Sequence, residues 1–262
     1  MRSGLRGILF DLDGVLYNAG EPIAGAAETL SWVRRRSIPH LFVTNTTSLP
    51  RSALVEKLTR FGIETVEDRI LTPASAAVMW LRSQPEGKLA LFVKPQARGD
   101  FEALPQVGAE AETGADYVVI GDLGRDWTYA ALNRAFRLLH HNPKAVLLAL
   151  GMTRFWQAPD GISLDVAPFV TALEHATGRQ AVVLGKPAKP FFRAAADQIG
   201  LPPAAVIMIG DDIAADIGGA QKAGLKGMLV KTGKFRAQDL EDEIRPDATL
   251  DSIADLPAWW EG

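Results

Sequence analysis

Short runs of apolar residues alternate with longer amphipathic stretches along the chain. The apolar runs predict buried parallel strands of one core sheet at residues 7–10, 40–44, 181–185, 206–210 and 227–231. The amphipathic stretches predict helices at residues 24–36, 52–61, 189–199 and 213–223. Glycine follows each of the last three helices, at a position where it commonly ends a helix. The alternation predicts the α/β class.

A second alternation of the same kind occupies the middle of the chain. It predicts strands at residues 89–93, 117–120 and 145–150 and helices at residues 128–141 and 166–176. The connections at residues 83–87 and 178–180 have the composition of loops. We therefore expect a core domain of residues 1–84 and 181–262, with a second domain inserted at residues 85–180.

Composition and charge narrow the range of functions. The chain has 28 Lys and Arg against 31 Asp and Glu and a net charge of −3, so no nucleic-acid or membrane partner is expected. The absence of cysteine excludes disulfides, zinc-thiolate sites and thiol nucleophiles. The apolar run at residues 8–10 is too short for a signal peptide or a membrane span, which predicts a cytoplasmic protein.

Polar residues follow most of the predicted core strands. They are Asp11 and Asp13, Thr44 and Asn45, Lys186, and Asp211 and Asp212. The carboxyl ends of parallel strands form the ligand-binding edge of an open sheet, so these groups are expected to meet there. Each alone has an ordinary explanation, such as a turn at Asp13-Gly14 or a surface position for Lys186. Their occurrence at successive strand ends favours a site.

The acidic residues predict a metal site. If the first strand stays extended, Asp11 and Asp13 face the same side. Like charges roughly 4 Å apart repel by ~4 kcal/mol at an effective dielectric constant of 20, so a cluster with Asp211 and Asp212 requires a cation or protonation. Oxygen ligands without cysteine favour Mg²⁺, which is held by carboxylates and by a substrate phosphate.

The remaining groups suit phosphoryl transfer. Lys186 supplies a fixed positive charge and Thr44 a hydroxyl donor, and both can hold a phosphoryl group. Asp11 can attack phosphorus as a carboxylate, which divides one difficult displacement into two easier ones. Asp13 can protonate the departing oxygen and then activate water. Because a halide leaves without a proton, the second acid favours a phosphatase over a dehalogenase.

Four motifs resemble, in order and spacing, those of the haloacid dehalogenase (HAD) superfamily. They are residues 11–15, 44–45, 186–187 and 210–216. The resemblance implies a Rossmann-like core with Asp11 as the nucleophile and Asp13 as the acid and base. It also implies a set of residues that hold the phosphoryl group, namely Leu12, Thr44, Asn45 and Lys186. For Asn45, a helix cap is an equally good interpretation.

The resemblance also assigns roles to the other acidic residues. It implies that Mg²⁺ is held by Asp11, by Asp211 and by the main-chain carbonyl of Asp13. Asp212 would contact the ligands or waters of the metal, and Asp216 would orient Asp212 or the motif lysine. Asp216 follows Asp212 by about one helical turn, and the alternative is that it faces solvent.

The position of the insertion indicates one branch of the superfamily. About 30 residues separate Asp13 from Thr44, which is too few for a cap, whereas about 140 separate Thr44 from Lys186. This spacing resembles the branch with an α/β cap of the C2, type IIA class, which includes phosphatases of sugar phosphates, pyridoxal phosphate and 4-nitrophenyl phosphate. Residues 153–161 and 168–174 are similar to members that act on phosphohistidine and pyrophosphate.

Residues of the inserted domain are candidates for a lid over the substrate. Arg154 would bind a charged group, with Phe155, Trp156 and Asp160 beside it. Alternatively, the two aromatic residues belong to the core of the cap or to a contact between copies. A homodimer formed through the cap is one expectation of the resemblance. Residues 165–167 replace glycines that the resemblance predicts in this loop.

The leading hypothesis is a Mg²⁺-dependent phosphohydrolase that acts on a phosphate ester, phosphoamide or pyrophosphate of a small molecule through a phosphoaspartate. The alternatives are a phosphotransferase or mutase acting on a sugar phosphate, and a non-catalytic protein that binds a phosphorylated ligand. The position of the insertion argues against the mutase, and competent residues at every catalytic position argue against the binding protein. The motifs recognise only the phosphoryl group, so they do not identify the substrate.

Overall fold

The computed structural model describes residues 4–47, 49–158, 161–241 and 243–262 and divides the chain into two compact units. The first unit comprises Met1–Thr44, Arg51–Leu71 and Lys186–Gly262, and the second comprises Asn45–Pro50 and Thr72–Gly185. Each unit contains a parallel sheet with helices, which confirms the predicted α/β class.

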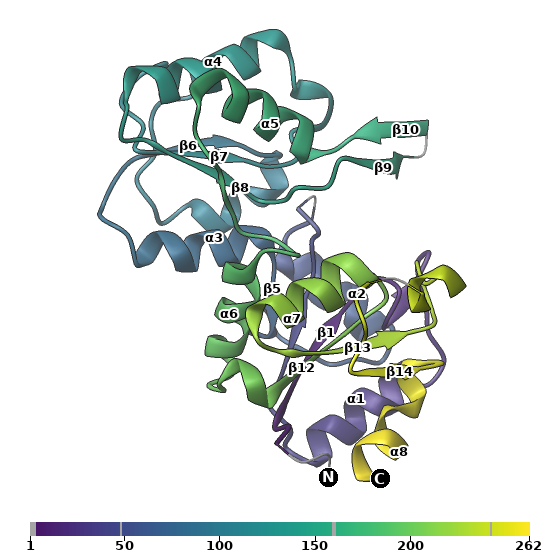
Figure 1. Cartoon of the computed structure of the whole chain (residues 1–262). Helices are drawn as coiled ribbons and strands as arrows, with labels where there is room; N and C mark the ends of the chain where they lie inside the picture. The colour runs from purple at the N-terminus through teal and green to yellow at the C-terminus, as the bar shows by residue number, and fades with distance from the viewer. Residues whose placement is uncertain (1–3, 48, 159–160, 242) are drawn as a thin grey trace. The chain divides into compact units, whose positions relative to one another are not determined.

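The first unit is built on a six-stranded parallel sheet with the order β14-β13-β12-β1-β4-β5 (Figure 1). Its strands are β1 (Gly7–Asp11), β4 (His40–Val43), β5 (Ile70–Leu71), β12 (Val206–Gly210), β13 (Lys226–Val230) and β14 (Ala248–Leu250). Phe10 of β1 is in register with Phe42 on one side and with Ile209 on the other. The strand order reverses between β1 and β12, and such a switch point is where open α/β sheets bind ligands.

Helices pack against this sheet and bury its strands. They are α1 (Ala26–Arg35), α2 (Arg51–Arg60), α6 (Lys189–Gln198), α7 (Gly219–Ala223) and α8 (Leu256–Glu261), and a π-helical turn (Ile213–Gly218) leads into α7. Leu30 of α1, Leu54 of α2 and Trp260 of α8 pack in one cluster with Phe10. Every residue of β1 and of β12 is buried, which accounts for their uninterrupted apolar sequences. A short antiparallel ribbon of β2 (Tyr17–Asn18) and β3 (Glu21–Pro22) follows β1.

The second unit has a four-stranded parallel sheet with the order β11-β8-β7-β6. Its strands are β6 (Leu89–Phe92), β7 (Tyr117–Ile120), β8 (Val146–Ala149) and β11 (Val182–Val183). The helices α4 (Tyr129–His141) and α5 (Val166–Thr177) lie on one face, and α3 (Pro73–Arg82) lies on the other (Figure 1). An antiparallel hairpin of β9 (Phe155–Ala158) and β10 (Gly161–Leu164) extends from this unit.

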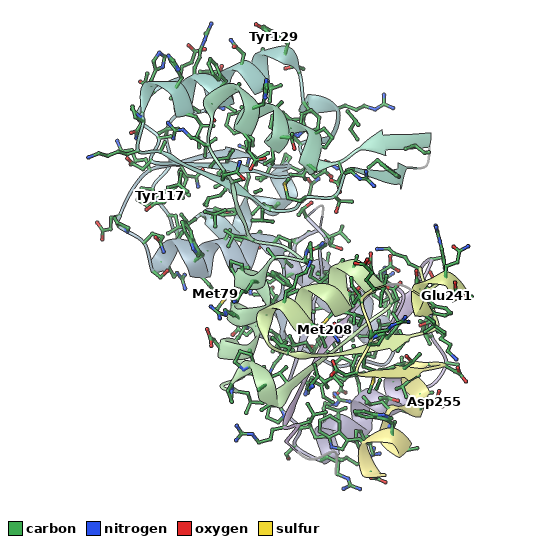
Figure 2. The ribbon with its side chains drawn as sticks, viewed as in Figure 1. Met79, Tyr117, Tyr129, Met208, Glu241 and Asp255 are labelled. Carbon is green, nitrogen blue, oxygen red and sulfur yellow. The ribbon has the colours of Figure 1, made fainter. Side chains whose placement is uncertain are left out.

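The side chains labelled in Figure 2 include a buried and an exposed position. Figure 2 shows Met208 of β12 among the side chains of the first unit, where it is fully buried. Tyr129, the first residue of α4, lies at the outer surface of the second unit and is 84% exposed.

The structure corrects two expectations about the chain's organisation. Residues 181–185 were expected to form a core strand, but Val182 and Val183 pair with β8 in the second sheet. The units also divide near residues 72 and 185, not near 85 and 180, because α3 buries Ala77 and Leu81 in the cluster that contains Leu148 of β8. Apolar composition marks a strand or a helix face as buried, but it does not identify the sheet against which that face packs.

Candidate active site

Asp11 is the last residue of β1 and lies at the carboxyl end of the core sheet. Its carboxylate is buried, and its Oδ1 accepts a hydrogen bond of 2.8 Å from the backbone N–H of Leu12. The same oxygen lies 2.8 Å from Lys186 Nζ. Within the described part of the chain, Asp11 Oδ2 accepts no hydrogen bond. Oδ1 is therefore held by two contacts, and Oδ2 is the oxygen that is able to react.

Lys186 lies between two buried carboxylates. Its Nζ is 2.8 Å from Asp11 Oδ1 and 2.7 Å from Asp216 Oδ1, and its side chain is only 4% exposed. Burial acts to lower the pKa of Lys186, but the two carboxylates outweigh it and raise the pKa above 10.5. The ammonium therefore stays charged. The resemblance led us to expect a contact of Asp216 with Lys186 or Asp212, but not the pairing of Lys186 with Asp11.

Asp216 reaches this site from the π-helical turn. It is fully buried, so the alternative that it faces solvent is wrong. Its Oδ2 accepts a hydrogen bond of 3.2 Å from the backbone N–H of Asp212, and its Oδ1 pairs with Lys186. Asp216 thus contacts both of the residues that it was expected to orient.

Asp211 follows β12 and is held by two loops. Its Oδ2 accepts a hydrogen bond of 2.7 Å from the backbone N–H of Lys234. A Cβ atom on Gly14 would lie 2.0 Å from this oxygen, and one on Gly233 would lie 2.1 Å from it. Both glycines have positive φ, +81° and +61°. Thr232 Oγ1 donates a hydrogen bond to the Gly14 carbonyl and joins the two loops.

Asp212 caps the π-helical turn. Its Oδ1 accepts hydrogen bonds from the backbone N–H groups of Ala214 (3.0 Å) and Ala215 (2.8 Å). Lys234 Nζ lies 3.9 Å from Asp212 Oδ2 at the surface. The carboxylate of Asp212 therefore has a structural role in this turn.

Three buried carboxylates come together beside one lysine. Asp11, Asp211 and Asp216 each offer an oxygen, and these oxygens lie within 4.8 Å of one another. Burial raises the pKa of all three carboxyls, to about 6 for Asp211 and about 7 for Asp216, while Lys186 opposes the shift. When all three are ionised, two negative charges remain without a balancing positive charge in the cluster.

The cluster fits a divalent cation. Within the described residues, Asp211 Oδ1 is buried and has no hydrogen-bond partner. Both oxygens of Asp216 already contact the Lys186 ammonium or the N–H of Asp212. The partnerless oxygen available to a cation therefore belongs to Asp211, and the carboxylate of Asp11 lies in the same cluster. Their hard oxygen donors suit Mg²⁺.

The turn after β1 corrects the expectation about Asp13. The strand ends at Asp11, and the N–H of Leu16 donates to the carbonyl of Leu12 at 2.9 Å, so the chain turns. As a result Asp11 is buried, Asp13 is exposed, and the two do not continue one extended strand. The carboxylate of Asp13 also lies outside the buried cluster.

The second motif is divided between the two units. Thr44 belongs to the first unit, is buried, and its N–H donates to the carbonyl of Leu71 at 3.1 Å. Asn45 begins the second unit, and a Cβ on Gly185 would lie 3.1 Å from its Oδ1. Thr44 and Asn45 are therefore positioned by contacts in different units.

Arg154 also belongs to the second unit, just before β9. It is exposed, and its guanidinium carbon lies 5.9 Å from the centre of the Phe155 ring. Phe155 is 54% exposed, so it is not part of a cap core. Asp160 and the side chain of Trp156 lie outside the described residues.

Sequence reasoning missed the clamp around Asp211. The expected site did not include Gly14, Gly233 or the N–H of Lys234, which together fix this carboxylate. Gly14 lies within the first motif, but no role was assigned to it, to Gly233 or to Lys234.

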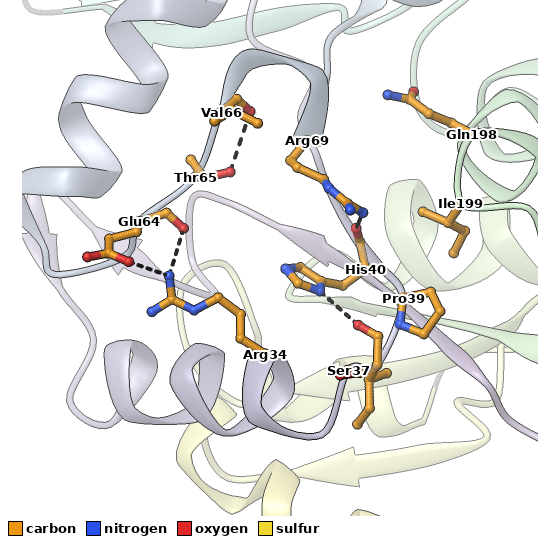
Figure 3. Close-up of a pocket in the computed structure, with 11 residues that line it drawn as sticks. Arg34, Ser37, Pro39, His40, Glu64, Thr65, Val66, Arg69, Gln198 and Ile199 are labelled. Atoms are coloured by element: carbon orange, nitrogen blue, oxygen red, sulfur yellow. Dashed lines mark hydrogen bonds and ion pairs between the residues drawn. The ribbon is translucent and has the colours of Figure 1, made fainter.

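A cavity of about 750 Å³ lies elsewhere in the first unit, where β4 begins (Figure 3). Arg34 Nη1 there donates to Glu64 Oε2 at 3.0 Å, and Arg69 donates to the His40 carbonyl at 3.3 Å. Its lining includes none of the motif residues. Cavity size therefore does not mark the site.

Comparison with known families agrees with the motifs. Residues 8–109 match the family described as haloacid dehalogenase-like hydrolase, and residues 183–256 match a second HAD-hydrolase-like family.

Within the described residues, no helix has the length and apolarity needed to cross a membrane.

Named relatives cover nearly the whole chain. Human phospholysine phosphohistidine inorganic pyrophosphate phosphatase is 36% identical over 97% of this chain and 93% of its own length. Bovine haloacid dehalogenase-like hydrolase domain-containing protein 2 is 42% identical over 94% and 91%.

Solved structures of phosphatases also match this chain over nearly its whole length. The 4-nitrophenylphosphatase of Thermotoga maritima matches with a TM-score of 0.86 and 26% identity, covering 97% of each chain. The p-nitrophenyl phosphatase of Archaeoglobus fulgidus matches with a TM-score of 0.87 and 27% identity, covering 97% of this chain and 99% of its own. With the motif residues at the carboxyl end of the core sheet, these matches show that the chain belongs to the haloacid dehalogenase-like hydrolases and is a phosphatase of that family.

Proposed function

We propose that this phosphatase is Mg²⁺-dependent and hydrolyses a small phosphorylated compound through a phosphoaspartate at Asp11. The observation that carries the proposal is the pairing of Asp11 Oδ1 with the Leu12 N–H and Lys186 Nζ, which leaves Oδ2 without a hydrogen bond in the described chain. The buried, partnerless Oδ1 of Asp211 in the same cluster supports the metal.

The ligands for Mg²⁺ would be the carboxylates of Asp11 and Asp211 and the main-chain carbonyl of Asp13. Bound there, the ion would neutralise charge on the phosphoryl oxygens. Lys186 contributes a second positive charge, and its two carboxylate contacts hold it in place. Asp216 and Asp212 position these groups but do not react.

The proposed reaction has two steps, formation of the phosphoaspartate and its hydrolysis. In the first, Asp11 Oδ2 forms a bond to phosphorus while the bond from phosphorus to the leaving oxygen breaks, and Asp13 gives its proton to that oxygen. In the second, Asp13 takes a proton from water, the water oxygen bonds to phosphorus, and the Asp11–phosphorus bond breaks. Thr44, Asn45 and Lys186 hold the phosphoryl oxygens, while the Leu12 N–H, which the resemblance placed in this set, holds Asp11 Oδ1 instead.

The substrate class is proposed from the names of the relatives. A phosphate ester, phosphoamide or pyrophosphate is proposed because relatives are named for 4-nitrophenyl phosphate, phosphohistidine, phospholysine and pyrophosphate. That Arg154 binds a charged group of the substrate stays a prediction from the resemblance.

The first test is release of phosphate from 4-nitrophenyl phosphate with Mg²⁺, with excess EDTA, and with Asp11→Asn. We expect activity only with the metal and a loss of at least ~100-fold in Asp11→Asn, because an amide is a poor nucleophile. Full activity in EDTA would contradict the metal requirement. Full activity of the variant would contradict the role of Asp11.

A further inference from the structure

A lysine outside the four motifs lies against the ribbon that follows β1. Lys57 of α2 places its Nζ 3.6 Å from the centre of the Tyr17 ring, which is a cation–π contact. Tyr17 is only 4% exposed, and its ring also packs against Phe61 at 5.7 Å. The ammonium therefore has a defined position.

Tyr17 is fixed to the turn that carries Asp13. The N–H of Gly14 donates to the Tyr17 carbonyl at 2.7 Å, and Asp13 forms a β-bridge with Tyr17. Lys57 therefore packs on the residue that pairs with Asp13, and the charge of Asp13 acts to raise the pKa of Lys57 against the larger lowering by burial. Lys57 thus brings a positive charge near the proposed general acid.

No carboxylate within the described residues lies at ion-pair distance from Lys57. By contrast, Lys226 and Lys231 lie 2.8 Å and 2.7 Å from carboxylates. The charge of Lys57 is therefore not neutralised by an ion pair in the described chain, although the side chain is half-buried.

We propose that Lys57 is a specificity-determining residue that attracts negative charge on the leaving group of the substrate. This inference rests on the proposed function, in which Asp13 protonates the leaving oxygen. Because that proton transfer requires hydrogen-bond distance, the leaving group lies beside Asp13 and close to Lys57. The favoured class has an anionic leaving group next to the broken bond, as in pyrophosphate.

The test compares kcat/KM for pyrophosphate with kcat/KM for 4-nitrophenyl phosphate, whose nitrophenyl group is uncharged in the bound substrate. We expect the wild-type enzyme to prefer pyrophosphate and Lys57→Gln to lower the ratio at least about tenfold, chiefly through KM, because one charge-assisted contact is lost. Lys57→Arg keeps the charge and should restore most of the ratio. Lys222→Gln removes the same charge from an exposed position of α7 and should leave the ratio unchanged.

Equal losses with both substrates in Lys57→Gln would overturn the proposal, because they indicate a packing role. A wild-type enzyme without preference for pyrophosphate would also overturn it. Both outcomes leave the proposed function intact provided that wild-type enzyme hydrolyses 4-nitrophenyl phosphate with Mg²⁺. If it does not, the proposed function itself fails.

Discussion

Lys186 Nζ lies 2.8 Å from Asp11 Oδ1, and both groups are buried. The contact fixes one oxygen of the proposed nucleophile and places a permanent positive charge where phosphoryl oxygens would bind. Because Asp216 pairs with the same ammonium, the position of Lys186 is set from two sides.

Replacement of this lysine tests the arrangement. Lys186→Met keeps much of the apolar stem and removes the charge, so we expect kcat/KM for 4-nitrophenyl phosphate to fall at least ~100-fold, as when a preorganised donor is removed. The control is Lys226→Met, which breaks the exposed pair with Asp247 and should leave activity unchanged. Melting temperatures of both variants show whether each is folded. Near-wild-type activity of folded Lys186→Met would contradict the role assigned here.

The glycine clamp around Asp211 predicts a metal-specific defect. Gly14→Ala would place a methyl group against Asp211 Oδ2, so we expect the Mg²⁺ concentration for half-maximal activity to rise about tenfold or more. Gly20→Ala is the matched control, because Gly20 has a similar φ of +91° and nothing within 4 Å of a Cβ. Both changes share backbone strain of about 1 kcal/mol. The same rise in both variants would refute the clamp.

The raised carboxyl pKa values predict how stability depends on pH. Between pH 3.8 and about 7, the metal-free folded protein binds protons at Asp211 and Asp216 that the unfolded chain has released. The contribution of these groups to stability therefore falls as pH rises through this window. Bound Mg²⁺ requires the ionised forms, so it should raise the melting temperature more at pH 8 than at pH 5. Calorimetry with EDTA or Mg²⁺ measures this, and a larger Mg²⁺ effect at pH 5 would be inconsistent with the cluster.

The long apolar runs of the core were predictable from sequence. The strands at β1, β4, β12 and β13 are confirmed to within one or two residues, because uninterrupted burial leaves a clear pattern. The strands β5 and β14 have two and three residues, and their pairing depends on neighbours that sequence does not show. The hairpin at β9 and β10 was also missed, since its partly exposed residues lack the apolar alternation of a buried strand.

The residues that form the site could be predicted from the sequence, but the backbone that surrounds them could not. The motifs indicated that Asp11, Asp211 and Lys186 would come together, and the structure places them at the carboxyl end of the core sheet. The turn that exposes Asp13 and the loop that brings Lys234 N–H to Asp211 were not predictable. Both depend on backbone conformation and on packing between segments far apart in the chain.

The proposed mechanism requires that phosphorus is bonded to Asp11 during turnover. Acid quenching of the enzyme with substrate and Mg²⁺, followed by borohydride reduction, converts an acyl phosphate into homoserine that peptide mass spectrometry can locate. We predict homoserine at position 11, in a larger fraction for Asp13→Asn because water attack is slowed. Turnover without any modification at position 11, in either protein, would rule out the phosphoaspartate.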